Sequence, residues 1–183
     1  NRLVSDPLNT TALSDLVRRF ITLNDFEQAI AYCDKLLSID ATLKEAKELD
    51  LYLKSDGFNQ LRLKNALEST QVALAQEQFP NAKKDLDICL KLAPDNKEVL
   101  QIAASYYQEA NQLKDAIMIL KKLVKLTPKD PYLWTNLAVM CLELNKPEAA
   151  KEALDKLSGC SIPEPLLETV EWLTLEMTKG NDE

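Results

Sequence analysis

Residues of the same kind recur in this sequence at a fixed interval of 34 positions. A trio of alanines keeps that step: Ala82, Ala116 and Ala150. Leucine, proline and asparagine positions keep it too: Leu86, Leu120 and Leu154; Pro94 and Pro128; Asn111 and Asn145. Chance rarely keeps several residue classes in phase. The sequence therefore predicts repeated units of about 34 residues, each of which buries its apolar surface only by stacking on its neighbours.

Within each unit, small, aromatic and large apolar residues follow one order. In the third unit the series is Leu100, Ala103, Ala104, Tyr107, Ala116, Leu120 and Pro128. The fourth unit repeats it with Trp134, Leu137, Ala138, Cys141, Ala150 and Leu154. Weaker copies run through residues 66–94 and 13–39. This order resembles the tetratricopeptide repeat, a helix–turn–helix motif, over about four fifths of the chain.

The resemblance implies an all-α fold: a right-handed superhelical solenoid of helix–turn–helix repeats with a C-terminal capping helix. The alanine of each unit should lie where the two helices cross, since a larger side chain there would push them apart. The expected segments are repeat 1 at 7–41, an extra helix or insertion at 42–62, repeat 2 at 63–96, repeat 3 at 97–130, repeat 4 at 131–162 and the capping helix at 163–178.

The register breaks once, because Ala29 and Ala82 are 53 residues apart. The surplus contains a stretch with Lys and Glu as i,i+4 neighbours, which predicts an amphipathic helix near residues 43–55. The extra helix either kinks the superhelix or extends the inner helix of the next unit, and the sequence leaves both open.

A last helix is predicted to begin at Pro165. Its apolar residues share one face: Leu166, Val170, Leu173 and Met177. The end of a repeat array needs a cap with a polar outer face, and we expect this helix to supply it. Exchange of this helix with a neighbouring molecule is the alternative.

Catalysis is not indicated by the residue types present. The chain has no His, which excludes an imidazole base, a Cys–His nucleophile and a His-ligated metal. Its three Gly stand far apart, so there is no glycine-rich phosphate loop. Most carboxylates fall at exposed helical positions. We therefore expect no enzymatic activity, no cofactor and no metal site.

Composition gives weaker indications about the compartment. There is no apolar run of transmembrane length and no signal peptide. Cys33, Cys89 and Cys141 fall at core positions of the repeat, which favours a reducing, cytoplasmic compartment. The chain begins at Asn1 rather than Met, so we expect a fragment or a processed product, and the missing targeting segment is uninformative.

The net charge of −7 is unevenly distributed. Residues 161–183 carry six acidic side chains and one Lys. Four lysines cluster late in the third unit: Lys121, Lys122, Lys125 and Lys129. They form either a solvated outer face or a docking patch for an anionic partner. Nucleic acid is not expected, because no aromatic residues are interleaved with these lysines and no nucleic-acid motif is present.

In the family that this chain resembles, the inner helices line a concave groove that binds extended peptides or partner helices. The inner-face residues expected to bind a peptide are Arg18, Gln71, Gln101, Ser105, Gln108, Tyr132, Thr135, Val139 and Leu142. This mixed lining suits hydrogen bonds to a peptide backbone together with one or two apolar anchors.

Cochaperones of the same family grip a C-terminal carboxylate with Lys, Arg and Asn on three successive inner helices. With the last three units as the frame, those places hold Leu67, Gln71, Ile102, Tyr132 and Asn136. With the first three units they hold Ser14, Arg18, Glu68, Glu98 and Ile102. Neither frame supplies the cations that would pair with a carboxylate, so we expect no such clamp.

The predicted function is a non-catalytic adaptor or scaffold that binds a peptide or helix of a partner protein in its groove. Two alternatives remain open. One is a structural scaffold that self-assembles into homo-oligomers. The other is a regulatory repeat segment of a larger enzyme.

Overall fold

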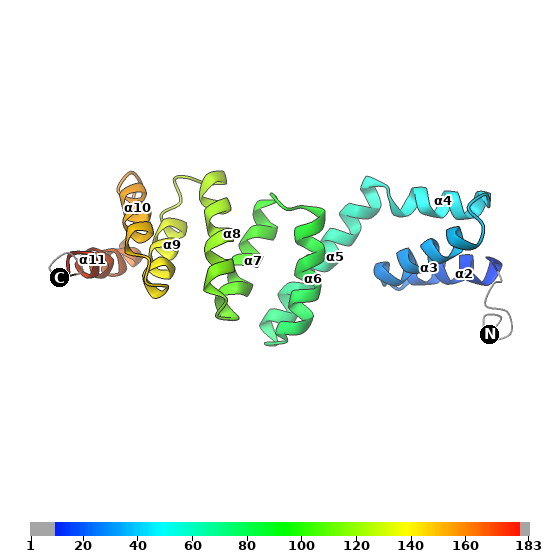
Figure 1. The fold of residues 1–183 in the computed structure, drawn as a ribbon, viewed down its shortest axis with the longest axis horizontal. Helices are drawn as coiled ribbons and strands as arrows, with labels where there is room; N and C mark the ends of the chain where they lie inside the picture. The colour runs from blue at the N-terminus through cyan, green and yellow to red at the C-terminus, as the bar shows by residue number, and fades with distance from the viewer. Residues whose placement is uncertain (1–9, 180–183) are drawn as a thin grey trace. The chain divides into compact units, whose positions relative to one another are not determined.

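The computed structural model describes residues 10–179, and within them it contains ten α-helices and no strand. The predicted all-α fold is confirmed. The helices form two compact units that divide between Glu68 and Ser69. The long helix α5 (Asp56–Ala75) begins in the first unit and ends in the second (Figure 1). No helix within residues 10–179 is long and apolar enough to span a membrane.

In the first unit, α2 (Thr10–Thr22) and α3 (Phe26–Ile39) pack as a hairpin, and α4 (Lys44–Leu53) lies against both. The core of this unit consists of Leu13, Val17, Phe26, Ala29, Cys33, Leu36, Ala46, Leu49, Leu53 and Phe58. The residues that break the 34-residue register form α4 as a separate helix. They also lengthen α5, which has 20 residues, whereas α7 has 13.

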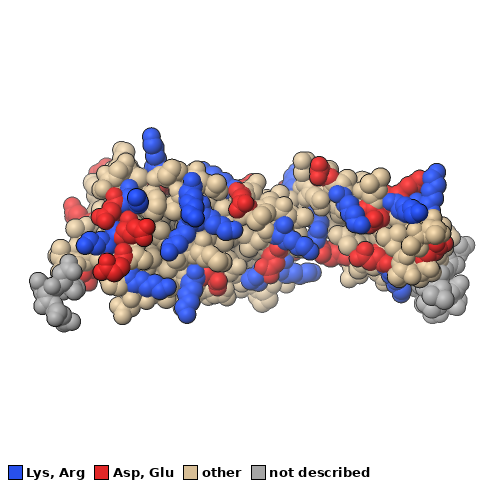
Figure 2. All heavy atoms as spheres, turned by 45° about the horizontal axis from the view of Figure 1, so that its top comes forward, with Lys and Arg blue, Asp and Glu red and all other residues tan. Residues whose placement is uncertain are grey.

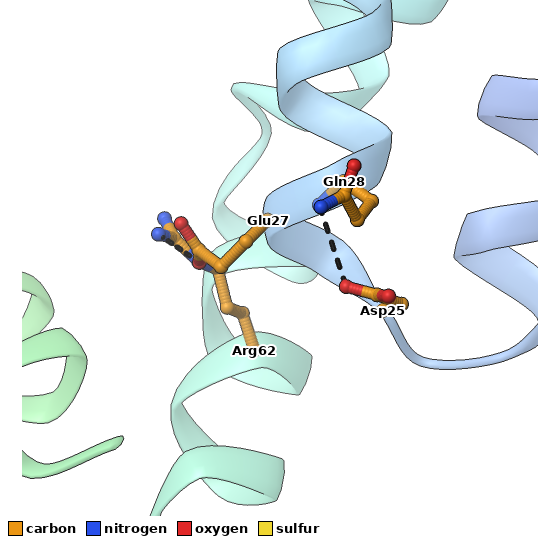
Figure 3. Close-up of polar contacts among 4 residues, drawn as sticks. All are labelled: Asp25, Glu27, Gln28 and Arg62. Atoms are coloured by element: carbon orange, nitrogen blue, oxygen red, sulfur yellow. Dashed lines mark hydrogen bonds and ion pairs between the residues drawn. The ribbon is translucent and has the colours of Figure 1, made fainter. Parts of the chain in front are cut away.

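Two contacts hold the start of α5 against α3. The buried ring of Phe58 meets Phe26 edge-to-face, with ring centroids 5.1 Å apart. One turn later, the Arg62 guanidinium donates to Glu27, with Nε 2.8 Å from Oε1 (Figure 3). The Arg62 side chain is only 11% exposed and Glu27 is 44% exposed, so this pair is partly shielded from water. An apolar contact and a charged one therefore fix the same two helices.

The second unit continues with helical hairpins (Figure 1). Its helices after α5 are α6 (Phe79–Leu92), α7 (Lys97–Glu109), α8 (Leu113–Leu126), α9 (Pro131–Glu143), α10 (Pro147–Leu157) and α11 (Glu164–Lys179). Its core draws on every one of these helices, with Leu86, Leu100, Leu120, Leu123, Leu137 and Leu173 among its buried leucines. Short connections join these helices, and from α7 to α11 each helix packs on the one before it.

The turn inside each hairpin contains one residue in the left-handed conformation. These residues are Asn24, Glu77, Asn111 and Asn145, with φ between 54° and 58°. At the end of α7, Asn111 N–H donates to Gln108 O at 3.0 Å and Gln112 N–H donates to Tyr107 O at 2.7 Å. This pair of bonds satisfies carbonyls that the helix end leaves free. The other three turns repeat the same pattern.

Asparagine tolerates this left-handed conformation better than most side chains do. The step between Asn111 and Asn145 therefore has a backbone cause rather than a packing one. The α5–α6 turn is the exception, because it places Glu77 there, and the exposed Glu77 side chain forms no hydrogen bond or ion pair with a described residue.

The cysteines at predicted core positions are buried. All four thiols are free, and only Cys160 is partly exposed. Burial raises the pKa of the Cys89 thiol to about 11 and raises those of Cys33 and Cys141 as well. These three side chains therefore stay protonated at neutral pH and act as small apolar residues.

Helix α11 packs against α9 and α10 through the face predicted from the sequence. Leu173 is fully buried there, and its neighbours on that face are half-buried: Leu166, Val170 and Met177. The opposite face differs from the polar surface expected of a cap. Leu167, Trp172 and Leu175 are exposed on it.

The alanines of the 34-residue step are completely buried at 0% exposure: Ala82, Ala116 and Ala150, joined by Ala29 in the first unit. Ala116 belongs to α8 and lies in the core that α8 shares with α7 and α9. Interiors at native packing density have no space for three additional carbon atoms at such a position.

We predict that Ala116→Leu lowers the free energy of unfolding by about 1–3 kcal/mol, because the added side chain forces neighbouring helices apart. Thermal or urea unfolding followed by circular dichroism measures the change. Ala31→Leu, at an exposed position of α3, is the matched control and should be nearly neutral. Equal stability of the Ala116→Leu variant and the wild type would mean that α8 is wrongly placed.

We predict that Glu77→Asn raises the free energy of unfolding by about 0.5–1 kcal/mol, since it relieves part of the left-handed strain. Glu109→Asn makes the same chemical change at a right-handed helical position of α7, and it should bring no gain. Melting curves of the two variants compare them directly. A loss of stability in Glu77→Asn would contradict the strain argument.

Candidate functional site

The end of α7 and one side of α9 enclose a cleft of about 220 Å³. Its lining is Gln108, Asn111, Leu113, Asn136, Val139, Met140 and Glu143. The floor is apolar: Met140 is buried and Val139 is half-buried. The side chains of Gln108, Asn136 and Glu143 are exposed at its edge. The cleft thus combines an apolar base with a polar rim.

The polar rim makes no side-chain bonds to the part of the chain that the structure describes. The side chains of Gln108, Asn136 and Glu143 neither donate nor accept a hydrogen bond, nor form an ion pair, with any residue in 10–179. All three side chains are exposed, so water satisfies their hydrogen bonding in the free protein. These groups are therefore free to bond to a molecule that enters the cleft.

The helical period explains why these residues lie together. Tyr132, Asn136, Val139 and Glu143 are spaced i, i+4, i+7 and i+11 along α9, so they form one stripe. The α7 residues Gln101, Ser105 and Gln108 form a similar stripe. Gln108 and Val139, both predicted from the sequence, line the same cleft. Tyr132, also predicted, is 48% exposed at the start of the α9 stripe.

The remaining predicted residues of α7 are exposed but lie outside the cleft. Gln101 and Ser105 point to solvent, and the Ser105 hydroxyl donates to the Gln101 carbonyl at 3.3 Å. Gln71 is exposed on the part of α5 that belongs to the second unit.

Thr135 does not lie on the surface where the sequence pattern places it. Its side chain is 2% exposed, and its hydroxyl donates to the Pro131 carbonyl at 2.9 Å. A ligand therefore cannot reach it. The next residue, Asn136, takes the exposed position, because a step of one residue turns a helix by about 100°. The sequence prediction did not include Asn136 and Glu143. Their i+4 and i+11 spacing from Tyr132 is the pattern that could have identified them.

Leu142 follows Val139 by three residues on α9, a spacing that puts the two at adjacent positions on one side of the helix. It lines a second cleft of about 450 Å³ between the α9–α10 hairpin and α11. Leu154 and Met177 line this cleft with it, and Lys151 and Glu176 are among its charged residues. The two apolar residues expected to anchor a peptide, Val139 and Leu142, therefore line different clefts.

Arg18 belongs to the first unit and already has a partner. Its Nη2 lies 2.8 Å from Glu45 Oε1 on α4. The first unit also holds a cleft of about 220 Å³ with charged walls. Lys54 there pairs with Asp50 at 2.8 Å, and Arg62 pairs with Glu27. The cations of this unit's cleft are therefore occupied by internal carboxylates.

Charged side chains of both signs cover the surface of the second unit. On the face shown in Figure 2, basic and acidic residues are interspersed rather than segregated. Within residues 10–179, no group of three carboxylates or thiols is arranged to hold a metal ion.

Comparison with known protein families gives three matches, all to tetratricopeptide repeat models. They cover residues 20–49, 73–135 and 107–159. No curated protein matches the chain.

Solved structures with a similar fold are also tetratricopeptide proteins. The Sgt2 tetratricopeptide domain from Aspergillus fumigatus is 19% identical, with a TM-score of 0.55 over 66% of this chain and 82% of that one. YrrB, described as a tetratricopeptide protein with an unusual peptide-binding site, is 16% identical, with a TM-score of 0.51 over 94% and 95% of the two chains. The TPR2AB domain of yeast Sti1, in a complex with pHSP90, is 16% identical, with a TM-score of 0.51 over 92% and 69%.

At these identities the structural likeness shows a common fold and nothing about the ligand. The family models are more specific, because together they match more than half of the 183 residues. Arrays of such repeats present extended surfaces for binding other proteins. The chain belongs to the tetratricopeptide repeat family.

Proposed function

We propose that this chain is a non-catalytic protein–protein interaction module that binds an extended segment of a partner protein at the cleft between α7 and α9. The observation that carries the proposal is the rim of Gln108, Asn136 and Glu143, whose side chains have no bond to any described residue. Side chains that do not stabilise the fold are available for recognition.

The chemistry of the rim favours a peptide backbone. Each side-chain amide offers both a donor and an acceptor, which match the C=O and N–H of an extended chain. Gln108 and Asn136 would bond to the backbone from opposite sides of the cleft. Val139 and Met140 would contact an apolar side chain of the peptide, and the exposed ring of Tyr132 would extend that contact.

The charge of the cleft indicates which peptides it favours. Glu143 is the one ionisable residue in the described lining, so the cleft is negative. A Lys or Arg side chain of the partner would form a charge-assisted hydrogen bond with it. A C-terminal carboxylate would be repelled, which argues against a carboxylate clamp. We therefore propose an internal peptide segment that carries a basic residue.

The experiment has two stages. A library of random peptides displayed on phage is selected on the immobilised full chain, and enriched peptides are then synthesised and titrated by calorimetry. We expect enrichment of sequences with Lys or Arg beside an apolar residue. We predict that the double variant Gln108→Ala, Asn136→Ala binds them about tenfold or more weakly, because two hydrogen bonds are lost.

The controls separate binding from folding. The melting temperature of the double variant should equal that of the wild type, since neither side chain bonds within the protein. Gln60→Ala removes an exposed amide far along the sequence and should leave the affinity unchanged. Unchanged affinity in the double variant, or failure to enrich any peptide, would reject this cleft as the binding site.

A further inference from the structure

Helix α11 exposes an apolar surface at the end of the array. Leu167 is 47% exposed, Trp172 is 45% exposed and Leu175 is 55% exposed. Its other face is the packed one, where Leu173 is buried. A terminal repeat unit is expected to turn a polar face to water. Large exposed apolar side chains around the outer half of this helix instead indicate a surface that a partner covers, and Leu175 lies at its centre.

Acidic residues accompany these apolar side chains. Glu164, Glu168, Glu171 and Leu175 are spaced i, i+4, i+7 and i+11, so they form a stripe along the exposed face of α11. None of the three glutamates has an ion pair with any residue in 10–179. We call this stripe the acidic face.

Helix α8 presents the opposite charge with the same spacing. Lys114, Met118, Lys121 and Lys125 are also spaced i, i+4, i+7 and i+11, and all four are exposed. Met118 is 53% exposed at the second position of this stripe. The three lysines have no ion pair with another described residue, whereas their neighbour Lys122 lies 3.9 Å from Asp95. We call this stripe the basic face.

Three of the four positions in each stripe match in one register. When the two helices are placed antiparallel, Lys125 and Lys121 fall opposite Glu168 and Glu171, and Met118 then falls opposite Leu175. Each stripe is about 16 Å long, at 1.5 Å per residue of helix. Two charge pairs and one apolar contact therefore coincide in one register. Opposite charges in register favour association and specify the partner.

We propose that the acidic face of α11 in one copy of this chain docks on the basic face of α8 in another copy. The occupant is a second copy because the chain itself supplies a basic helix with the complementary spacing. The two faces belong to different helices, so the contact is heterologous and each copy keeps one face free. Copies therefore add in series, into open chains or a closed ring. None of these residues lines the α7–α9 cleft, so the inference is independent of peptide binding.

The test measures the mass of the full chain by sedimentation and light scattering over a range of concentrations. We expect the mean mass to rise with concentration. It should fall when the ionic strength is raised from about 0.05 M to 0.5 M, because salt screens exposed charge pairs. A wild-type protein that stays monomeric at every concentration would overturn the proposal.

Two charge-reversal variants identify the faces. The first variant, Glu168→Lys with Glu171→Lys, places positive charges opposite the basic face. The second variant, Lys121→Glu with Lys125→Glu, places negative charges opposite the acidic face. Each variant alone should associate at least about tenfold more weakly than the wild type. An equimolar mixture of the two should associate again, because each reversed face then meets a complementary one. A mixture that stays monomeric, or single variants that associate normally, would refute the assignment.

Net charge needs its own control, since charge alone changes association. Lys84→Glu with Lys91→Glu reverses two exposed lysines of α6 and gives the same net charge as the α8 variant. It should associate like the wild type. Circular dichroism verifies that every variant is folded. If the control variant also becomes monomeric, the effect is one of net charge and the docking site is not α8.

Discussion

The close crossing of two helices at a buried alanine is the constraint on which this structure depends. Ala29, Ala82, Ala116 and Ala150 are fully buried, so at these positions each helix places only a methyl group against its neighbours. This close crossing brings the leucines of each helix into contact with those of the next. A single hairpin cannot cover its own apolar surface, which is why the units stack. The position of every surface side chain follows from that stacking, because it determines which side of each helix remains exposed.

The sequence was sufficient to predict the all-α fold, because small and large apolar residues can keep a 34-residue step only if similar hairpins recur. It also named Gln108 and Val139 as candidate binding residues, and both line one cleft of the structure, while their role in binding stays a prediction. It did not predict that Thr135 is buried or that Leu142 lines a different cleft from Val139. For Thr135 the difference is a rotation about the α9 axis, where a shift of one residue exchanges a buried position for the exposed one of Asn136. Such rotations are fixed by packing between helices that a single repeat pattern does not specify.

The candidate cleft contains two kinds of residue: those that pack in the core of the repeat array, and those whose side chains are exposed and available to bind another molecule. Met140 belongs to the core and also forms the floor of the cleft. The side chains of Gln108, Asn136 and Glu143 form no hydrogen bond with any described residue. The exposed stripes of α8 and α11 are a second example, since their charges lack internal partners as well.

The single glutamate among the left-handed turn residues has a consequence for how the array opens. The turns at Asn24, Asn111 and Asn145 hold a residue suited to their backbone, whereas the turn at Glu77 does not. Local opening begins where the native conformation is least favourable. In native-state hydrogen exchange, the amides beside Glu77 should therefore exchange through a lower-energy fluctuation than those beside Asn111. The α5–α6 hairpin would then lie at the boundary between two segments of the array, each of which unfolds cooperatively.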